Sequence, residues 1–499
     1  MSLAIVHTRA QEGIHSPAVR VEVHLAGGLP GLSIVGLPEA AVKESKDRVR
    51  AALMTAGFEF PTRRITISLA PADLPKEGGR FDLPIAIGIL AASGQVPVEA
   101  LKQREFLGEL SLTGQLRSAR GVFTAALAAG KSQRELIIPT EDAAQAAMAG
   151  ASEVLAAASL LEVCRYLHGE LKLEFPPPET APAKLEQGPD LLDVVGQHQA
   201  RRALEVAAAG GHNLLFVGPP GTGKTMLASR LPGILPPLSE REAMEAAAIA
   251  SISQQPLQAG QWKQRRFRAP HHTASGVALV GGGSRPKPGE ISLAHQGVLF
   301  LDELPEFDRR VLDVLREPLE SGRIIISRAA RQAEFPARFQ LVAAMNPCPC
   351  GFADDGTDRC LCTPMQVQRY RSRVSGPLLD RIDVQIEVPR LETGQLNRGL
   401  TGEPSSEVRA RVIRARQAQM QRSGTCNAQL SEADLRQHCE LSENDRQLLE
   451  TAMDHLRLSA RASQRILRMA RTIADLAQSA TIQTPHLSEA IGYRRIKLH

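Results

Sequence analysis

The sequence has no long hydrophobic run. No stretch approaches the roughly 18 uncharged apolar residues that a membrane-spanning helix needs. The first residues, Met1–His7, also lack the pattern of a signal peptide. These absences argue against an integral membrane protein and a secreted one. We therefore expect a cytoplasmic protein without a membrane partner.

An excess of charge of one sign is absent too, and cysteines are few. The 59 Lys and Arg residues against 54 Asp and Glu residues leave a net charge of +5. Any contact with DNA would therefore depend on local basic patches. Seven cysteines without a secretory signal favour thiols or a metal site over disulfides. There is no internal repeat and no long low-complexity tract, and 499 residues suffice for about three domains.

A glycine-rich run ending in lysine and threonine follows the apolar stretch 214–217. The run matches G-x-x-x-x-G-K-[ST] at every fixed position, and strand, loop and helix occur in the required order, which disfavours an ordinary turn. In such a loop, backbone amides surround phosphate oxygens, Lys224 reaches the β- and γ-phosphates, and the Thr225 hydroxyl contacts Mg²⁺. The predicted site for ATP and Mg²⁺ consists of Gly218, Pro219, Pro220, Gly221, Thr222, Gly223, Lys224 and Thr225.

A second apolar run, 297–301, ends in two carboxylates. A buried parallel strand would deliver these acids to the carboxyl edge of a sheet, where Asp302 would hold Mg²⁺ and Glu303 would polarise the attacking water. The apolar run 341–345 predicts another strand. Asn346 at its end either orients that water or merely caps the strand.

Changes of composition divide the chain. The Pro-rich segment 174–183 has no periodicity, and helical patterns begin beyond Val388-Pro389. We expect a first domain over 1–170, a linker over 171–189, an ATPase core over 190–390 and a helical lid over 391–499.

Four cysteines are clustered in an insert, 348–362, directly after Asn346. Two C-x-C pairs joined by a short loop can adopt the tetrahedral S₄ geometry that suits a structural Zn²⁺. Zinc is favoured over free thiols here, and its ligands would be Cys348, Cys350, Cys360 and Cys362.

The P-loop, the acidic strand, Asn346 and the segment 378–383 together resemble the magnesium-chelatase/minichromosome-maintenance branch of AAA+ ATPases, over residues 190–499. The segments 268–273 and 289–295, with the upstream domain, resemble the ComM/YifB family of bacterial magnesium-chelatase-like proteins over the whole length. The resemblance implies an α/β fold. It consists of an AAA+ P-loop core with a parallel sheet and helices on both faces, a C-terminal helical lid, and a preceding α+β domain like that of Lon protease.

The resemblance also implies roles for two arginines. In such rings Arg381 of one subunit would complete the neighbour's site, which ties hydrolysis to a homo-hexamer; a salt bridge to Asp380 or Asp383 is the alternative. Arg461 falls on the second sensor of the lid. Three further arginines recur with Arg461 at three- and four-residue spacing, which favours a solvated basic face for Arg457, Arg465 and Arg468.

The N-terminal domain resembles the proteolytic domain of Lon through 75–80 and the apolar helix 83–92. Lon-type enzymes have a serine nucleophile where Arg80 stands, and their lysine base falls on Phe123. Without a nucleophile and a base, acyl-enzyme chemistry has no route. We therefore predict an inactive protease domain, retained for assembly or partner contact.

Two loops project into the pore of related helicases. One corresponds here to a hairpin from Ile324 to Phe335, and the other follows the basic segment 262–268. Phosphate binding requires positive charge, so the candidate DNA contacts are Arg328, Arg331, Arg265, Arg266 and Arg268, although a surface role stays open for each. The adjacent His271 and His272 cannot share one face, which favours a loop-shaping or interface role over metal binding.

The prediction is an ATP-driven hexameric DNA translocase or helicase. The family resemblance implies branch migration in homologous recombination, including natural transformation, with recombination proteins among the partners. The alternative is a protein-remodelling ATPase of the magnesium-chelatase type that acts on a protein partner. The upstream domain and the cysteine cluster argue against that alternative, and Arg80 argues against an active protease.

Overall fold

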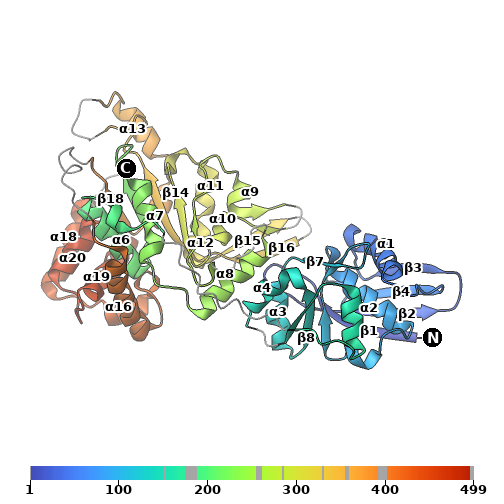
Figure 1. The fold of residues 1–499 in the computed structure, drawn as a ribbon. Coiled ribbons are helices and arrows are strands. Elements are labelled where there is room, and N and C mark those ends of the chain that lie inside the picture. The colour runs from blue at the N-terminus through green and yellow to red at the C-terminus, as the bar shows by residue number, and fades with distance from the viewer. Residues whose placement is uncertain are drawn as a thin grey trace. The chain divides into compact units, whose positions relative to one another are not determined.

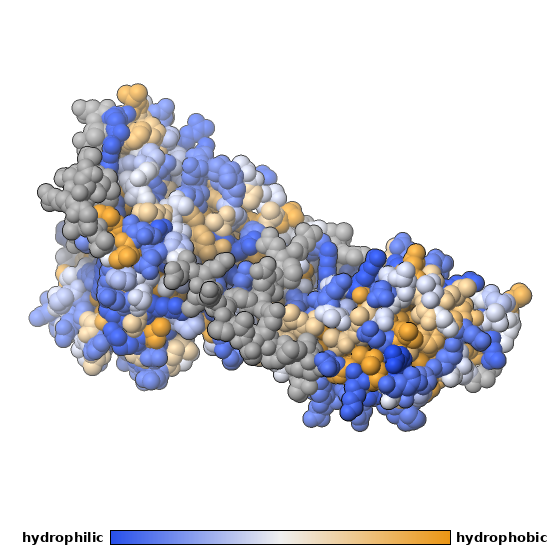
Figure 2. All heavy atoms as spheres, viewed as in Figure 1, coloured by the Kyte–Doolittle hydropathy of each residue, from blue (hydrophilic) through white to orange (hydrophobic). Residues whose placement is uncertain are grey.

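The computed structural model describes two compact units. The first contains the described residues up to 174 and those between 246 and 262, and the second contains the remainder. Hydrophilic residues cover most of the face seen in Figure 2, with apolar residues in small separate groups. No helix in the described ranges combines the length and apolarity that a bilayer crossing requires. The described ranges are 2–150, 153–174, 188–253, 261–283, 286–328, 331–353, 359–390 and 402–494.

The first unit is built on a mixed sheet with the strand order β3-β4-β2-β1-β5-β8-β9. Strand β2 pairs antiparallel with β1 and β4, whereas the other neighbours are parallel. In β2, alternate valines point into the core, as in a strand with one buried face. The strands are β1 (Ser2–Arg9), β2 (Ala18–Ala26), β3 (Gly31–Val35), β4 (Arg64–Ala70), β5 (Arg104–Phe106), β8 (Glu135–Pro139) and β9 (Val154–Ala157).

Helices α1 and α2 pack together beside this sheet (Figure 1). Helix α2 is buried along its whole length, which confirms the predicted apolar helix. The helices of this unit are α1 (Ala40–Thr55), α2 (Asp82–Ala92), α3 (Val122–Lys131), α4 (Ala143–Ala147) and α5 (Leu160–Leu167), and a short ribbon pairs β6 (Glu109–Leu110) with β7 (Leu116–Arg117).

The second unit is built on a parallel sheet with the strand order β11-β14-β17-β10-β18. Every residue of β10, β14 and β17 is buried, as expected for apolar strands covered by helices on both faces. The three strands predicted from the apolar runs are thereby confirmed. The strands are β10 (Leu214–Val217), β11 (Phe267–Arg268), β14 (Val298–Leu301), β17 (Gln340–Met345) and β18 (Val384–Glu387).

Helices α6 (His198–Gly210) and α7 (Lys224–Ile234) contact this sheet. The division between the two units falls within α8 (Glu240–Ile252). The shorter helices are α9 (Gly276–Val280), α10 (Glu290–Leu293), α11 (Arg309–Val314), α12 (Arg316–Ser321), α13 (Pro364–Arg371) and α14 (Gly376–Leu379). Two antiparallel ribbons complete the unit, β12 (Gly281–Gly282) with β13 (Lys287–Pro288), and β15 (Arg323–Arg328) with β16 (Arg331–Pro336).

The C-terminal part is helical (Figure 1). In the first half of α19 the buried residues are spaced by three and four, at Ala462, Ile466 and Met469, so one face of the helix packs. From Met469 to Asp475 every residue is buried, and the helix contacts α6, α16 and α20. With the parallel sheet and its covering helices, this region confirms the predicted α/β fold class. Its helices are α16 (Ser405–Ser423), α17 (Glu432–His438), α18 (Glu443–Leu456), α19 (Ala460–Leu476) and α20 (Thr484–Gly492).

A buried carboxylate connects the helical region to the sheet. Asp383 is 3% exposed, accepts a hydrogen bond from the Asn213 backbone N–H at 3.0 Å and pairs with Arg465 of α19. Arg468 donates to the Leu430 carbonyl at 2.7 Å. The expectation of a solvated basic face is therefore wrong for Arg465 and Arg468, because both guanidinium groups have partners within the unit.

Replacing Asp383 by Asn should weaken this connection. Burial alone would raise the pKa of Asp383, but His212 and Arg465 outweigh it and hold the pKa below the usual aspartate range. A folded-state pKa below the unfolded one means that the contribution is complete above the unfolded pKa and is lost as the pH falls through the folded pKa. We expect Asp383→Asn to lower the free energy of unfolding by roughly 3 kcal/mol at neutral pH.

Urea denaturation followed by circular dichroism measures this loss. The difference in the free energy of unfolding between the variant and the parent should become smaller below about pH 4. The control is Asp380→Asn, because the side chain of Asp380 is 53% exposed. It should change stability by no more than about 0.5 kcal/mol. Equal losses in the two variants would contradict the role given to Asp383.

Candidate nucleotide site and cysteine cluster

Strand register brings the predicted site residues to one edge of the parallel sheet. Val217 at the end of β10 lies opposite Met345 of β17, and Leu301 at the end of β14 lies opposite Ala343. Parallel strands end at the same edge of a sheet, so the P-loop, the acidic pair and Asn346 emerge side by side.

Lys224 is the first residue of α7 and follows Gly223, whose positive φ of 89° lets the loop turn into the helix. Its Nζ donates to the carbonyls of Gly218 at 2.6 Å and Pro219 at 2.8 Å, and to Asn346 Oδ1 at 3.1 Å. Burial lowers the pKa of Lys224, while Asp302 and Glu303 act in the opposite direction. The ammonium group is thus held between the P-loop and the end of β17.

Thr225 and Asp302 lie together at this edge. The Thr225 Oγ1 donates to Asp302 Oδ2 at 2.6 Å, and Asp302 Oδ1 accepts the Glu303 backbone N–H at 2.9 Å. A hydroxyl and a carboxylate placed side by side are oxygen donors of the kind that Mg²⁺ takes beside nucleotide phosphates. The residues therefore fit the metal that the P-loop pattern implies.

Glu303 has a neighbour that the sequence did not reveal. The side chain of Glu303 is 52% exposed, and its Oε2 lies 3.1 Å from His272 Nδ1. His272 follows β11, which pairs in parallel with β14, so its chain leaves the same sheet edge as Glu303. The pairing of β11 with β14 brings the two side chains together, and the sequence alone does not show which strand pairs with β11.

The four clustered cysteines lie close enough to share one ion. Their sulfur atoms all fall within 4.8 Å of one another, and Cys348 Sγ lies 3.3 Å from Cys350 Sγ and 3.7 Å from Cys360 Sγ. Zinc–sulfur bonds of about 2.3 Å in a tetrahedron require sulfur separations near 3.8 Å. A backbone hydrogen bond from Phe352 lowers the pKa of Cys350 to about 6. A backbone hydrogen bond from Cys362 acts to lower the pKa of Cys360, but burial and the hydrogen bonds to Cys350 and Cys348 outweigh it and raise that pKa to about 12. The donor set and its dimensions fit Zn²⁺.

The turn after Cys350 packs directly on the P-loop. Gly351 has a φ of +87°, and a Cβ at this position would lie 2.7 Å from Pro220 Cδ. Two residues after Asn346, the buried Cys348 begins the cluster, and Arg371 Nε donates to the intervening Pro347 carbonyl at 3.0 Å. The cysteine cluster, Asn346 and the P-loop therefore form one continuous packing unit.

The two arginines assigned by resemblance lie elsewhere in the second unit. Arg381 is 8% exposed, donates to the Pro377 carbonyl at 2.6 Å and pairs with Glu320. The alternative of a pair with Asp380 or Asp383 is wrong, since Glu320 is the carboxylate bound. Arg461 is exposed in the first turn of α19. Among the described residues, no hydrogen bond joins either arginine to the P-loop.

The candidate DNA contacts divide into two groups. The predicted hairpin is present, and Arg328 pairs with Arg331 across its end; their side chains lie outside the described part of the structure. Arg265 donates to the carbonyls of Pro236 at 2.7 Å and Gln296 at 2.8 Å, and Arg268 binds both carboxylate oxygens of Glu290 at 2.7 Å. Arg266 is half-buried. Contact of Arg265 or Arg268 with DNA would require these bonds to break.

In the first unit, the two positions compared with Lon carry unreactive groups. Arg80 is 6% exposed, its Nη1 donates to the Arg9 carbonyl at 3.4 Å, and burial lowers its pKa to about 10. Phe123 is fully buried in α3. A guanidinium and a phenyl group supply neither a nucleophile nor a base.

The parallel sheet with its P-loop lysine, acidic pair and Asn346 at one edge, followed by a helical region, defines the AAA+ class of P-loop ATPases. The family model of magnesium chelatase subunit ChlI matches residues 190–396, and further ChlI models match 21–142 and 402–494. The competence protein ComM of Haemophilus influenzae is 56% identical, over 99% of this chain and 98% of the relative. The chain belongs to the ComM/YifB family of magnesium-chelatase-like ATPases.

Two more relatives show how far the similarity reaches. The YifB protein of Escherichia coli is 53% identical, over 99% of this chain and 98% of its own length. The magnesium-chelatase 38 kDa subunit of Cereibacter sphaeroides is 26% identical, over 31% of this chain and 51% of the subunit. The ComM and YifB proteins thus match nearly the full length of this chain, whereas the chelatase subunit matches less than a third of it.

Gly351→Ala should impair the nucleotide site, because its Cβ would collide with Pro220 and its φ is positive. We expect nucleotide affinity to fall about tenfold, equivalent to roughly 1.4 kcal/mol. Equilibrium binding of a fluorescent ATP analogue measures it. The control is Gly424→Ala, which shares a positive φ of 70° but meets nothing within 4 Å.

The control should lose roughly 1 kcal/mol of folding stability through backbone strain and keep its affinity for nucleotide. If both variants lost nucleotide affinity, or if both kept it, the result would contradict the contact between Gly351 and the P-loop.

Proposed function

We propose that this protein is an ATP-driven DNA translocase or helicase that acts as a homo-hexamer. In this proposal it promotes branch migration in homologous recombination, including natural transformation, with recombination proteins as partners. The main support for an ATP-driven function is that five side chains lie together at one sheet edge: Lys224, Thr225, Asp302, Glu303 and Asn346. The name of the Haemophilus influenzae relative, competence protein ComM, supports the role in competence and recombination.

Each residue at the sheet edge has a proposed role in hydrolysis. The backbone from Gly218 to Thr225 would surround the phosphates, and Thr225 with Asp302 would hold Mg²⁺. Glu303 would accept a proton from the attacking water, while Asn346 would orient that water. The bond between Asn346 and Lys224 supports this role over simple strand capping, because it places the amide within reach of the phosphate site.

Two arginines would complete hydrolysis from outside the P-loop. Arg381 would enter the site of the neighbouring subunit, where a guanidinium stabilises charge on the transferred phosphoryl group. Because Arg381 is 8% exposed and pairs with Glu320, its entry into a neighbouring site would require that pair to break. Arg461, exposed at the start of α19, would serve as the second sensor of the lid.

DNA would be held through its phosphates by the hairpin formed by β15 and β16. Arg328 and Arg331 are the leading contacts, because a hairpin end concentrates two cations in every subunit of a ring. The basic segment with Arg265, Arg266 and Arg268 would supply the second loop. Since Arg265 and Arg268 are bonded within the unit, we assign the main phosphate contacts to the hairpin.

The remaining assignments concern architecture. We propose a structural Zn²⁺ held by Cys348, Cys350, Cys360 and Cys362, supported by the sulfur separations. We also propose an inactive Lon-protease-like domain over 1–170, a linker over 171–189, an AAA+ core over 190–390 and a lid over 391–499. The burial of Arg80 and Phe123 supports the loss of protease chemistry.

The second candidate function is protein remodelling. The ChlI family models that cover most of the chain, and the similarity to a magnesium-chelatase subunit, favour a protein partner of chelatase type. The two functions share the ATPase site and differ in the partner that stimulates it. They are therefore separated by asking which polymer accelerates hydrolysis.

Steady-state ATPase activity, measured with single-stranded DNA, with a four-way junction and without DNA, tests the proposal. We expect stimulation by DNA that declines as salt rises, because phosphate contacts release counterions. Arg328→Ala combined with Arg331→Ala should abolish stimulation and leave the DNA-free rate intact.

The matched control is Arg323→Ala, a change in the same hairpin at a residue that instead pairs with Glu334 at 3.3 Å. It should retain stimulation by DNA. ATP turnover that is insensitive to every DNA and every salt concentration would exclude the translocase and leave the protein-remodelling function.

Glu303→Gln should keep bound nucleotide while turnover falls more than tenfold, a loss above about 1.4 kcal/mol of transition-state stabilisation.

Zinc content tests the cysteine site. We expect about one zinc per chain by plasma mass spectrometry, since a Cys₄ set closes a tetrahedral structural site. Cys350→Ser should lose that zinc, whereas Cys164→Ala, a change at a buried thiol of α5 in the first unit, should retain it. Purified protein without metal, with all four clustered thiols reactive toward a mercurial probe, would contradict the site.

A further inference from the structure

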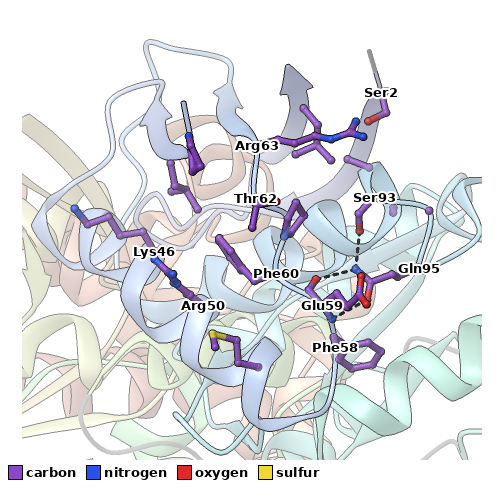
Figure 3. Close-up of a pocket in the computed structure, with 18 of the residues that line it drawn as sticks. Ser2, Lys46, Arg50, Phe58, Glu59, Phe60, Thr62, Arg63, Ser93 and Gln95 are labelled. Carbon is purple, nitrogen blue, oxygen red and sulfur yellow. Dashed lines mark hydrogen bonds between the residues drawn. The ribbon is translucent and has the colours of Figure 1, made fainter. Parts of the chain in front are cut away.

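A pocket of about 1300 Å³ opens on the surface of the first unit. It lies between α1, the chain that joins α1 to β4, and the end of α2 (Figure 3). None of the residues compared with the Lon nucleophile and base lines it. The pocket is thus separate from the two positions compared with Lon, and it has charged and aromatic residues of its own.

Positive side chains stand on two sides of this pocket. Lys46 and Arg50 lie four residues apart on the exposed face of α1, whose opposite face is buried, and Arg63 stands across from them just before β4. All three are exposed. In the described part of the chain, the side chains of Lys46 and Arg63 have no hydrogen bond or ion pair, and at Arg63 only the backbone carbonyl is bonded, to the Gly31 N–H at 3.4 Å. The acidic residues that line the pocket are Asp47 and Glu59. The three cations are therefore available to an anion.

One aromatic ring, that of Phe60, lies between the two basic sides, and Phe58 lies beyond Glu59 and Gln95 (Figure 3). Phe58 and Phe60 line the pocket, and the guanidinium carbon of Arg50 lies 5.2 Å from the centre of the Phe60 ring. The chain between them is tied to the end of α2, because Gln95 accepts the Glu59 N–H at 3.0 Å and donates to the Glu59 carbonyl at 2.9 Å. The rings are thus held in place rather than carried on a free loop (Figure 3).

We propose that this pocket binds single-stranded DNA. A held phenyl ring with a guanidinium over it offers a plane on which a base can stack, and the cations on either side match the phosphates that flank it. An acidic peptide would use the same cations but has no planar base to set against Phe60. The proposal rests on the proposed DNA motor. It gives the protein a second DNA-binding site, in its N-terminal domain, which raises the effective concentration of DNA at the ring.

Cross-linking of the full-length protein locates the site. Oligothymidylate that contains 5-bromodeoxyuridine, irradiated with the parent protein, should label the tryptic peptide 51–63, which carries both phenylalanines. Fluorescence anisotropy then gives the affinity for oligothymidylate across a salt series. Arg50→Gln combined with Arg63→Gln should weaken binding at least tenfold and reduce the slope of log affinity against log salt by about 1.4, which is about 0.7 per phosphate contact.

Phe60→Leu should weaken binding while leaving the salt slope unchanged, since it removes the stacking plane and no charge. Arg117→Gln, a change at an exposed residue of β7 in the same unit, is the control and should bind as the parent does. The DNA-free ATPase rate should be unaffected in all of these variants, because none of the positions lies in the nucleotide site.

The outcomes separate this proposal from the DNA motor itself. If the parent shows neither DNA binding nor DNA-stimulated hydrolysis, the proposed function fails. If hydrolysis is stimulated but the pocket variants bind DNA as the parent does and peptide 51–63 stays unlabelled, only the pocket proposal is overturned. Displacement of the oligonucleotide by polyglutamate at equal charge concentration would also overturn it, and would assign the pocket to an acidic protein segment.

Discussion

The parallel register of β10, β14 and β17 is the constraint on which the site depends. It places the ends of three strands at one edge, so that Lys224 can bond to the P-loop carbonyls and to Asn346 at once. A shift of one residue in a strand would turn its side chains to the other face and separate these groups. Every residue of the three strands is buried, so apolar patterning alone does not set this register. Gln340 at the start of β17 donates to the carbonyls of Ala207 at 2.9 Å and His212 at 2.7 Å, which anchors β17 beside β10.

Two contacts join the sheet to the surrounding structure of the second unit, one at each of its edges. On one side, the turn after Cys350 packs on Pro220, so the cysteine cluster, the strand that ends in Asn346 and the P-loop are in contact. At the opposite edge, Asp383 bonds to Asn213 just before β10 and joins the sheet to Arg465 of α19 through a buried ion pair. This ion pair therefore lies at the amino ends of the strands, away from the nucleotide site.

The strands and the site residues at their ends were predictable because they leave local marks. A continuous apolar run followed by a fixed pattern of glycine, lysine or acid is readable without knowing what it packs against, and the described structure has strands at all three runs. Partners distant in sequence were not predictable in the same way. Arg381 binds Glu320 rather than a neighbouring aspartate, and Arg465 is paired with Asp383 rather than solvated, because side-chain partners depend on which elements meet in space.

The sequence by itself determined the class of chemistry, since phosphate and metal binding need particular residues at fixed spacing in a single loop or strand end. It also determined the family, through segments spread over the whole chain. Only the tertiary structure decided that His272 meets Glu303, that Gly351 meets Pro220, and that Arg50 and Phe60 share a pocket with Arg63. These contacts join residues of separate elements, and their distances are set by packing of the fold rather than by spacing along the chain.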